Sequence, residues 1–380
     1  EGSPRPMRAM NLSNSLVNAG HRVVIWSSLF DHQTKKHRTS KMQSITVNDK
    51  LEIKLISSCG YKRNISLKRI IDHIEMAINL KKMLRKCSKL PDVAFVGYPP
   101  IETAAVMIWW LSKNGIPTLL DVKDQWPIIF AEAMPTKLKL LGNIIIKPYF
   151  LLAKYVFKKA TGISTMAKGF LKWALGFAGR EQTEFDNVFP LVSKIGNITD
   201  EELNKARKWW NNYNLKVTKN FRICYVGNHS PNVDLLPVKE AVTLFKKENM
   251  PIEFIIAGDG VTSNEFKKMM NELPNVVFPG WLNKAQYLAL AERCCASIIP
   301  YKNHKSFKLS IPNKIIDAFS LGLPILCPLE GEVASLIEEY DVGLRYGPGT
   351  GRTLYDCIKI LKDNPELQKR MSQNARALYE

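Results

Sequence analysis

The sequence is short of acidic residues, and the shortage is uneven. Its 380 residues contain 54 Lys and Arg against 35 Asp and Glu, a formal net charge of +19. Residues 1–190 hold 29 basic and 14 acidic residues (+15), whereas residues 191–380 hold 25 and 21 (+4). Residues 133–180 contain no Asp or Glu. We therefore expect the first half of the protein to face an anionic partner and the second half not to.

Three further absences narrow the kind of protein. The apolar runs fall short of the roughly 18 residues that a membrane-spanning helix needs. The seven cysteines form no Cys-x-x-Cys pair, which favours buried thiols in a reducing cytosol. No Asp-x-Asp pair occurs, and no His, Cys and carboxylate residues share the spacing of metal ligands, so we expect neither a metal nor a cofactor.

Short apolar, β-rich runs alternate with helical patterns along the whole chain. The first half contains RVVIWS, LEIKLI, DVAFVG, PTLLDV and GIST, and the second contains FRICYVG, IEFIIAG, NVVFPG, ASIIP and PILCP. Such alternation predicts parallel sheets covered by helices on both faces. Because the chain is too long for one such sheet, we expect an α/β protein with two doubly wound, Rossmann-like domains, residues 1–190 and 191–380, facing a cleft at the carboxyl ends of their strands. Since a loop and then a helix open the chain, we also expect the first strand of the N-terminal domain to be missing.

Glycine follows three of the predicted strands in the second half. VGN (Val226–Asn228), AGDG (Ala257–Gly260) and PGWL (Pro279–Leu282) each come directly after a strand. Glycine at such a turn lets backbone N–H groups approach a ligand closely, although it also ends strands for structural reasons alone. Three such turns within one domain indicate a ligand site more strongly than any one of them.

A short helix with a cation in its first turn lies further along the chain, in SIPNKIIDAFSLGLPIL. We expect Ser310 to cap this helix, Pro312 to occupy its first turn, and Gly322 to end it. Lys314 then lies in the first turn, where it opposes the helix macrodipole. An anion bound beside Lys314 and the helix N-terminus explains the arrangement; a lysine that extends to solvent is the alternative.

These segments resemble the bacterial glycosyltransferases of family 4, which have the GT-B fold. AGDG, VVFPGWL, IPNKIIDAFSLGLPIL, EGEVASLIEEYDVGL and NPELQKRMSQNAR follow that family's C-terminal domain in order and spacing. EGSPRPMRAMNLSNSLVNAGHRVVIWSS is similar to its opening, and DVKDQWP is similar to a segment of the branch that builds lipid-linked O-antigen or capsule. The resemblance implies a cytoplasmic, peripheral-membrane glycosyltransferase that transfers a sugar from a UDP-sugar, with retention of configuration, to a polyprenyl-diphosphate-linked or other glycan acceptor.

The resemblance also implies which residues bind the donor, with Lys314 as a charge partner for the diphosphate of the nucleotide-sugar. The donor-binding residues would be Gly2, Ser3, Arg5, Gly227, Asn228, Gly258, Gly260, Gly280, Leu282, Pro312, Asn313, Lys314, Asp317, Glu330, Gly331 and Glu332.

Two departures from the family pattern affect the donor site. Asp317 and Leu309 stand where the family commonly has two glutamates, and Leu309 cannot bind a sugar hydroxyl. The segment GNHSPNVD offers Asn228 where many members carry Arg and Lys, so Lys314 and Arg5 would have to compensate.

The N-terminal domain would then bind the acceptor. Asp124 and Trp126 follow a predicted strand, and we expect Asp124 to orient or deprotonate an acceptor hydroxyl, with a capping or ion-pairing role as the alternative. Basic residues of a loop on the same side, namely His32, Lys35, Lys36 and Arg38, are further acceptor candidates or simply a solvated charge run.

The acid-free stretch predicts a membrane surface rich in anionic lipid as a further partner. Its aromatic residues, Phe150, Tyr155, Phe157, Phe170 and Trp173, would lie at headgroup level, unless they are ordinary core and only the lysines are exposed. Two rival functions come from other classes: a basic nucleic-acid-binding protein, suggested by the net charge, and a catalytically silent relative that acts as a scaffold, suggested by Leu309. No helix-turn-helix, zinc or RNP pattern supports binding of nucleic acid, so we expect none.

Overall fold

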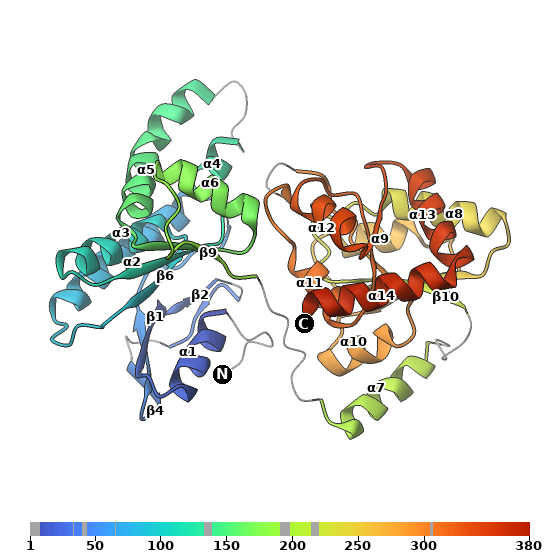
Figure 1. Ribbon diagram of the computed structural model, residues 1–380, viewed down its shortest axis with the longest axis horizontal. Coiled ribbons are helices and arrows are strands. Elements are labelled where there is room, and N and C mark those ends of the chain that lie inside the picture. The colour runs from blue at the N-terminus through green and yellow to red at the C-terminus, as the bar shows by residue number, and fades with distance from the viewer. Residues whose placement is uncertain are drawn as a thin grey trace. The chain divides into compact units, whose positions relative to one another are not determined.

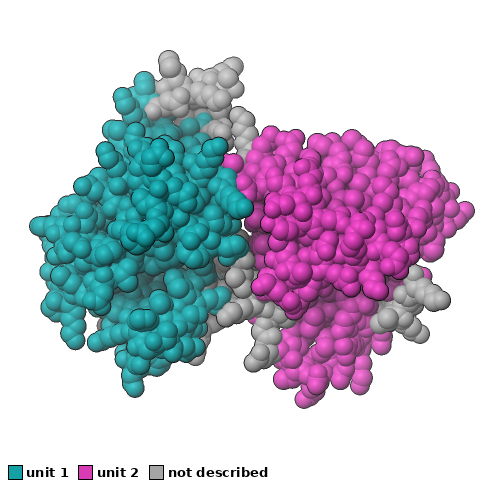
Figure 2. All heavy atoms as spheres, in the orientation of Figure 1, with its two compact units in different colours: residues 1–190 teal, residues 191–380 magenta. Residues whose placement is uncertain are grey.

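The computed structural model describes residues 8–32, 34–39, 44–64, 66–132, 139–190, 198–213, 220–304 and 307–380. The chain divides into two compact units, unit 1 (Glu1–Pro190) and unit 2 (Leu191–Glu380), which Figure 2 colours separately. Each unit has its own sheets, helices and core, and each is described by itself.

Unit 1 contains two sheets and a small hairpin. The first sheet has the order β1-β5-β4, where β1 (Val23–Ser28) and β5 (Leu51–Ile56) are parallel and β4 (Ser44–Asn48) is antiparallel to β5. The second sheet is parallel throughout, with the order β6 (Ala94–Tyr98), β7 (Thr118–Val122), β8 (Gly162–Thr165) and β9 (Asn187–Val188). The hairpin pairs β2 (Phe30–Asp31) with β3 (Lys36–His37).

The helices of unit 1 are α1 (Arg8–Asn18), α2 (Leu67–Arg85), α3 (Ile101–Lys113), α4 (Ile128–Glu132), α5 (Lys139–Lys159) and α6 (Lys168–Ala178). α2 packs against α3, α3 against α5, and α5 against α6, so neighbouring helices form a continuous layer (Figure 1). Within the described parts of the chain, no helix is long and apolar enough to cross a membrane.

The α5–α6 pair corrects one expectation. Phe157 and Phe170 are buried in the core, so the prediction that they lie at a membrane surface is wrong for these two. They pack with Trp173 and Phe177 of α6, with ring centroids 5.1 Å apart for Phe157–Phe177 and 5.2 Å apart for Phe170–Trp173. The other three aromatic residues of the prediction are half-buried, namely Phe150, Tyr155 and Trp173. An alternation of basic and aromatic residues does not reveal which helix face turns inward, and here the aromatics join the two helices.

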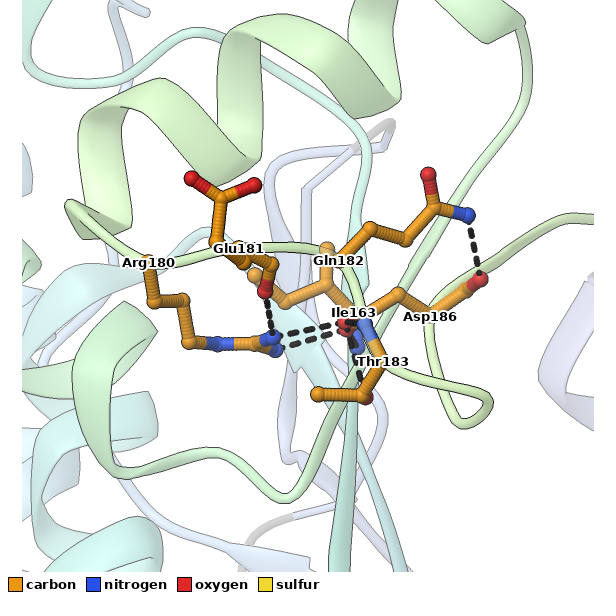
Figure 3. A network of polar contacts seen from close by, with 6 residues as sticks. All are labelled: Ile163, Arg180, Glu181, Gln182, Thr183 and Asp186. Carbon is orange, nitrogen blue, oxygen red and sulfur yellow. Dashed lines mark hydrogen bonds and ion pairs between the residues drawn. The ribbon is translucent and has the colours of Figure 1, made fainter.

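A buried carboxylate fixes the last strand of unit 1 (Figure 3). Asp186 accepts two hydrogen bonds of 2.6 Å from the Arg180 guanidinium, and it also accepts from the backbone N–H groups of Ile163 and Thr183, both at 2.7 Å. These bonds hold the pKa of Asp186 below its usual value, against the effect of burial. The network ties the segment before β9 to β8, which explains how a strand of two residues keeps its place.

Unit 2 has one parallel six-stranded sheet with the order β12-β11-β10-β13-β14-β15. Its strands are β10 (Phe221–Val226), β11 (Ile252–Ala257), β12 (Val276–Gly280), β13 (Ala296–Ile298), β14 (Ile325–Cys327) and β15 (Gly343–Arg345). The chain builds outward from β10 in one direction through β11 and β12, and in the other through β13. The point between β10 and β13, where the direction reverses, is where open α/β sheets bind ligands at the carboxyl ends of the strands.

Helices cover both faces of this sheet. They are α7 (Asp200–Asn211), α8 (Leu236–Lys247), α9 (Ser263–Met269), α10 (Lys284–Ala291), α11 (Asn313–Ser320), α12 (Glu332–Tyr340), α13 (Gly351–Asp363) and α14 (Pro365–Tyr379). Successive side chains of β10 enter different cores: Ile223 and Tyr225 join the α8 and α13 side, whereas Cys224 joins the α11 side. The strands are therefore buried on both faces, as their continuous apolar sequences predict.

Candidate functional site

The three glycine turns of unit 2 lie side by side at one edge of its sheet. The Gly227 N–H donates to the Ala257 carbonyl at 3.0 Å, and the Gly258 N–H donates to the Gly280 carbonyl at 2.7 Å. Gly260 donates its N–H to the Asp259 carboxylate at 2.8 Å. Parallel strands bring their carboxyl ends to the same edge, so the prediction that these turns form one site follows from the sheet topology.

Close approach of side chain and backbone explains two of these glycines. A Cβ on Gly227 would lie 1.8 Å from Cε of Lys314, and a Cβ on Gly258 would lie 1.8 Å from the Gly227 carbonyl oxygen. Both glycines also have positive φ angles, +156° and +126°. The turn after β10 is therefore shaped to let the Lys314 side chain pass directly over it.

Lys314 lies between the two strands that flank the reversal point. Its Nζ donates hydrogen bonds of 2.8 Å to the hydroxyl groups of Tyr225, in β10, and Tyr301, which follows β13. The ammonium group also lies 4.8 Å and 4.9 Å from the centroids of the two rings. Burial raises the pKa of Tyr225, so its hydroxyl stays neutral and donates in turn to the Asn228 carbonyl at 2.8 Å. The two phenol groups thus position the ammonium group of Lys314.

Lys314 lies on helix α11. The start of this helix differs from the prediction, whereas its end agrees with it. The structure starts it at Asn313 with Pro312 in the capping position, so the prediction that Ser310 caps the helix is wrong. Pro312 has no side chain to cap the first turn, and no acidic residue lies in that turn. Gly322 ends the helix as predicted, with φ +67° and the Leu323 N–H donating to the Ala318 carbonyl at 3.0 Å.

The other predicted donor residues occupy neighbouring positions. Asp317 and Leu309 are half-buried, whereas Asn228 and Asn313 are exposed. Glu330 forms an ion pair of 2.5 Å with Lys308, which holds the pKa of Glu330 below its usual value, and the Glu332 N–H donates to the Lys308 carbonyl at 2.9 Å.

The contacts of Glu330 and Glu332 with Lys308 join the loop before α11 to the start of α12. Gly331 lies beside them, and a Cβ on Gly331 would lie 2.0 Å from the Lys308 carbonyl oxygen. Leu282 packs against the α11-side core. Gly2, Ser3 and Arg5 lie outside the described residues.

The sequence analysis missed a buried histidine at this edge. His229 follows the Gly227 turn, and its Nδ1 lies 2.9 Å from the Ser263 hydroxyl, which donates to Asp259 at 2.6 Å. Because the hydroxyl proton is used on Asp259, Nδ1 of His229 must carry a proton and donate. Burial lowers the pKa of His229, which keeps the ring neutral. The segment GNHSPNVD contained the signal, but a search for cations alone passes over a neutral histidine.

In unit 1, Trp126 and Asp124 lie on the loop after β7. Trp126 is buried and stacks on His73, with ring centroids 5.8 Å apart at 28°, and the Arg69 guanidinium lies 4.8 Å from its ring centroid. Asp124 keeps an exposed side chain, yet partial desolvation by the surrounding protein raises its pKa, while Arg69 and Lys123 act in the opposite direction. A carboxylate of raised pKa is a stronger base, which suits the role expected for Asp124.

The four residues of the hairpin segment that were predicted to bind the acceptor divide into two groups. His32 and Lys35 reach Tyr61, the first through a hydrogen bond between Nδ1 and the phenol hydroxyl and the second at 4.7 Å from the ring centroid. Lys36 is exposed, and Arg38 lies 3.6 Å from Asp31 in an ion pair. Only His32 and Lys35 therefore join the aromatic residues near Trp126. Across the described ranges, no group of three or more His, Cys, Asp or Glu side chains is placed to hold a metal ion.

Comparisons with known proteins concern the C-terminal half of the chain and the overall fold. Residues 207–378 match the family model described as "Glycosyl transferases group 1", and no curated protein matches the chain significantly. Sucrose-phosphate synthase from Thermosynechococcus elongatus has a TM-score of 0.66 at 12% identity, over 98% of this chain and 87% of that one. WaaG, a glycosyltransferase involved in lipopolysaccharide biosynthesis, has a TM-score of 0.63 at 11% identity, over 98% and 90%. Anabaena HepE in complex with UDP has a TM-score of 0.60 at 14% identity, over 86% and 81%. The chain has the α/β GT-B fold.

Proposed function

We propose that the protein is a glycosyltransferase that uses a nucleotide-sugar, with UDP as the nucleotide. The observation that carries the proposal is Lys314, held by Tyr225 and Tyr301 at the reversal point of the unit 2 sheet, beside the uncapped start of α11. A fixed ammonium group and a helix N-terminus together favour a bound diphosphate. The match of residues 207–378 to the group 1 glycosyl transferases and the likeness to a UDP complex of HepE support the same donor.

In this proposal the donor diphosphate binds over Gly227. The backbone N–H groups of the glycine turns approach it, and Asp317 accepts hydrogen bonds from ribose hydroxyls. Glu330 and Glu332 lie at the neighbouring edge and would contact the donor sugar in place of Leu309. When the glycosidic bond to the diphosphate breaks, Lys314 and the helix N-terminus stabilise the charge that develops on the leaving group. The sugar keeps its anomeric configuration, and the donor phosphate helps to take the acceptor proton.

The acceptor assigned to unit 1 is a polyprenyl-diphosphate-linked glycan of O-antigen or capsule synthesis, with Asp124 orienting its hydroxyl group. A protein that works on such a lipid would be peripheral on the cytoplasmic face of the membrane. Helix α2 supports this placement, because one of its faces exposes Leu67, Ile70, Ile71, Ile74 and Ile78 by 41–79%.

These five residues, named here the α2 stripe, recur at helical spacing. Lys68, Lys81, Lys82 and Arg85 are exposed on the same helix, and on α5 the aliphatic residues Ile144, Ile145 and Leu151 are exposed near Lys147 and Lys154. An apolar face bordered by lysines fits an anionic bilayer surface.

A direct test measures donor binding and transfer separately. Calorimetry with a panel of nucleotide-sugars identifies the donor, and incubation of the preferred one with polyprenyl-diphosphate-linked acceptors detects transfer. Binding of a UDP-sugar without transfer to any lipid acceptor would favour the silent scaffold, and a tight, sequence-specific complex with nucleic acid would favour the other rival.

A further inference from the structure

A cluster of cations and aromatic rings in unit 1 is not explained by donor binding. Its members, named here the Arg69 cluster, are His32, Lys35, Tyr61, Arg69 and Trp126. They come from the hairpin, the segment before α2, the first turn of α2 and the loop after β7. Segments far apart in the sequence therefore bring two permanent cations to one place.

The two cations share their neighbours. The Arg69 guanidinium lies 5.6 Å from the Tyr61 ring centroid and 4.8 Å from that of Trp126, and Nη1 donates to the Asn64 carbonyl at 2.9 Å. Lys35 lies 4.7 Å from the Tyr61 centroid and donates to the Asn64 side-chain oxygen at 2.5 Å. Among the described residues, the buried Nε of Arg69 has no hydrogen-bond acceptor. The rings of Tyr61 and Trp126 are buried, whereas the charged groups that contact them are partly exposed to solvent.

The charges within the cluster repel one another. The pKa of Lys35 is lowered by desolvation and then by Arg69, and the pKa of His32 is lowered by desolvation and then by Lys35, Arg69 and His73. The N-terminus of α2, whose first turn has no acidic residue, adds positive potential at Arg69.

The nearby carboxylates make other contacts, although Asp31 also raises the pKa values of His32 and Lys35. Asp31 pairs with Arg38, Asp72 accepts from the Gly60 N–H at 2.6 Å, and Glu102 accepts from the Tyr149 hydroxyl at 2.8 Å and lies 3.7 Å from His73. Partial desolvation raises the pKa of Asp124, although Arg69 and Lys123 act in the opposite direction. An added anion would therefore relieve repulsion that these acids leave in place.

We infer that the Arg69 cluster binds the diphosphate of an isoprenoid-linked acceptor, at a site separate from the donor site of unit 2. The guanidinium fork and the ammonium group suit phosphate oxygens. The apolar part of the ligand is indicated by the α2 stripe, because Leu67, Ile70 and Ile71 are exposed on the same turn of α2 as Arg69. The inference depends on the proposed function only in identifying the ligand as the acceptor of the reaction.

The test uses inorganic pyrophosphate and farnesyl diphosphate as probes, with saturating UDP present to occupy the donor site. Calorimetry compares the parent protein with Lys35→Ala and Arg69→Gln, and with Lys36→Ala as the control, because Lys36 lies exposed on the same hairpin. Loss of one charge-assisted contact should weaken both probes by roughly tenfold or more, and the control should not change. Farnesyl diphosphate should bind more tightly than pyrophosphate.

A second measurement does not depend on affinity. Pyrophosphate should raise the pKa of His32, followed by NMR, since an anion favours the protonated ring. Unchanged binding in both cluster variants, an equal loss in Lys36→Ala, or an unshifted His32 would overturn the inference. Equal affinity for the two probes would show that the isoprenoid chain does not contribute to binding and that the cluster is a site for free phosphate. If UDP fails to bind any variant while pyrophosphate still shifts His32, the proposed donor chemistry fails and the Arg69 cluster stands.

Discussion

The two units share an architecture but use charge in opposite ways. Unit 2 is nearly balanced, and the cation of its candidate site, Lys314, is fixed by two phenols at the reversal point of one continuous sheet. Unit 1 carries most of the excess charge and distributes it over the Arg69 cluster and the exposed faces of α2 and α5. A single placed cation suits a small ligand of defined geometry, whereas a charged surface with an apolar stripe suits an extended one. The comparison therefore supports different ligands for the two units.

The largest effect should come from the buried carboxylate of unit 1. We expect Asp186→Ala to lower the free energy of unfolding by about 3–5 kcal/mol, because it leaves the Arg180 charge without its partner. Urea denaturation followed by hydrogen exchange should locate the loss in unit 1 and leave unit 2 protected. Glu184→Ala, an exposed acid two residues away, is the matched control. Equal loss of protection in both units would show that they do not unfold separately.

The same network predicts a pH dependence for unit 1. The folded pKa of Asp186 lies below its unfolded value of about 4, so its contribution is complete above that value. The contribution is lost as the pH falls through the folded pKa. The parent protein should therefore lose stability in unit 1 below about pH 4 more steeply than Asp186→Ala does. Parallel acid titrations of the two proteins would contradict this assignment.

The next effect concerns turnover. We expect Asp124→Asn to lower the transfer rate by about a hundredfold, the smaller end of what a positioned base contributes. UDP-sugar affinity should not change, because donor binding is assigned to unit 2. Wild-type turnover in this variant would make Asp124 a structural residue.

A smaller effect is expected for the donor diphosphate. Lys314→Ala should weaken UDP-sugar binding by about 2 kcal/mol, the order expected for a hydrogen bond to a charged group, and should leave the affinity for uridine unchanged. Lys302→Ala, an exposed lysine beside Tyr301, is the control. If calorimetry gives the same loss for uridine as for the diphosphate, Lys314 does not contact the phosphates.

The smallest effect for each residue is expected at the membrane surface. Lys154, Lys158 and Lys159 are exposed on α5, and each should contribute about 1 kcal/mol to binding of anionic vesicles. Changing all three to Glu should release the protein from such vesicles in sedimentation while circular dichroism shows an intact fold.

The control for this prediction uses the nearly neutral unit. Exposed lysines of unit 2, Lys208, Lys302 and Lys369, changed to Glu together should alter binding much less. An equal effect from either triple variant would mean that only the net charge matters, and the comparison between the units would lose its meaning for membranes.

Much of the fold was predictable because hydrophobic runs report burial directly. Five of the six parallel strands of unit 2 were identified by continuous apolar runs, and the end of α11 by Gly322, since a left-handed residue is a local requirement. β9 and β15 were not predicted, because their sequences, NV and GLR, contain too short an apolar run. The position of the three glycine turns at one edge of the sheet followed from the parallel arrangement of the strands before them. The hairpin and β4 were not predicted: their antiparallel pairings depend on short turns within a polar stretch rather than on apolar runs.

The candidate sites were predictable only in part. Lys314 had a local signal, a cation at a helix start, but Tyr225 and Tyr301 contact it across 89 and 13 residues. Arg69 and Tyr61 lay outside every motif, because the cluster exists only after the hairpin, α2 and the β7 loop come together. The start of α11 was placed at Ser310 because serine is a good cap, whereas the structure puts Pro312 in that position.

The two phenols that hold Lys314 have a consequence for the entropy of donor binding. A free lysine side chain gives up roughly 2 kcal/mol of rotamer entropy when it is immobilised. Here the hydrogen bonds to Tyr225 and Tyr301 impose that loss when unit 2 folds, before any donor arrives. Replacing both tyrosines with phenylalanine should therefore make the entropy of diphosphate binding less favourable while the charge of Lys314 is unchanged. The tyrosines would matter to the donor without contacting it.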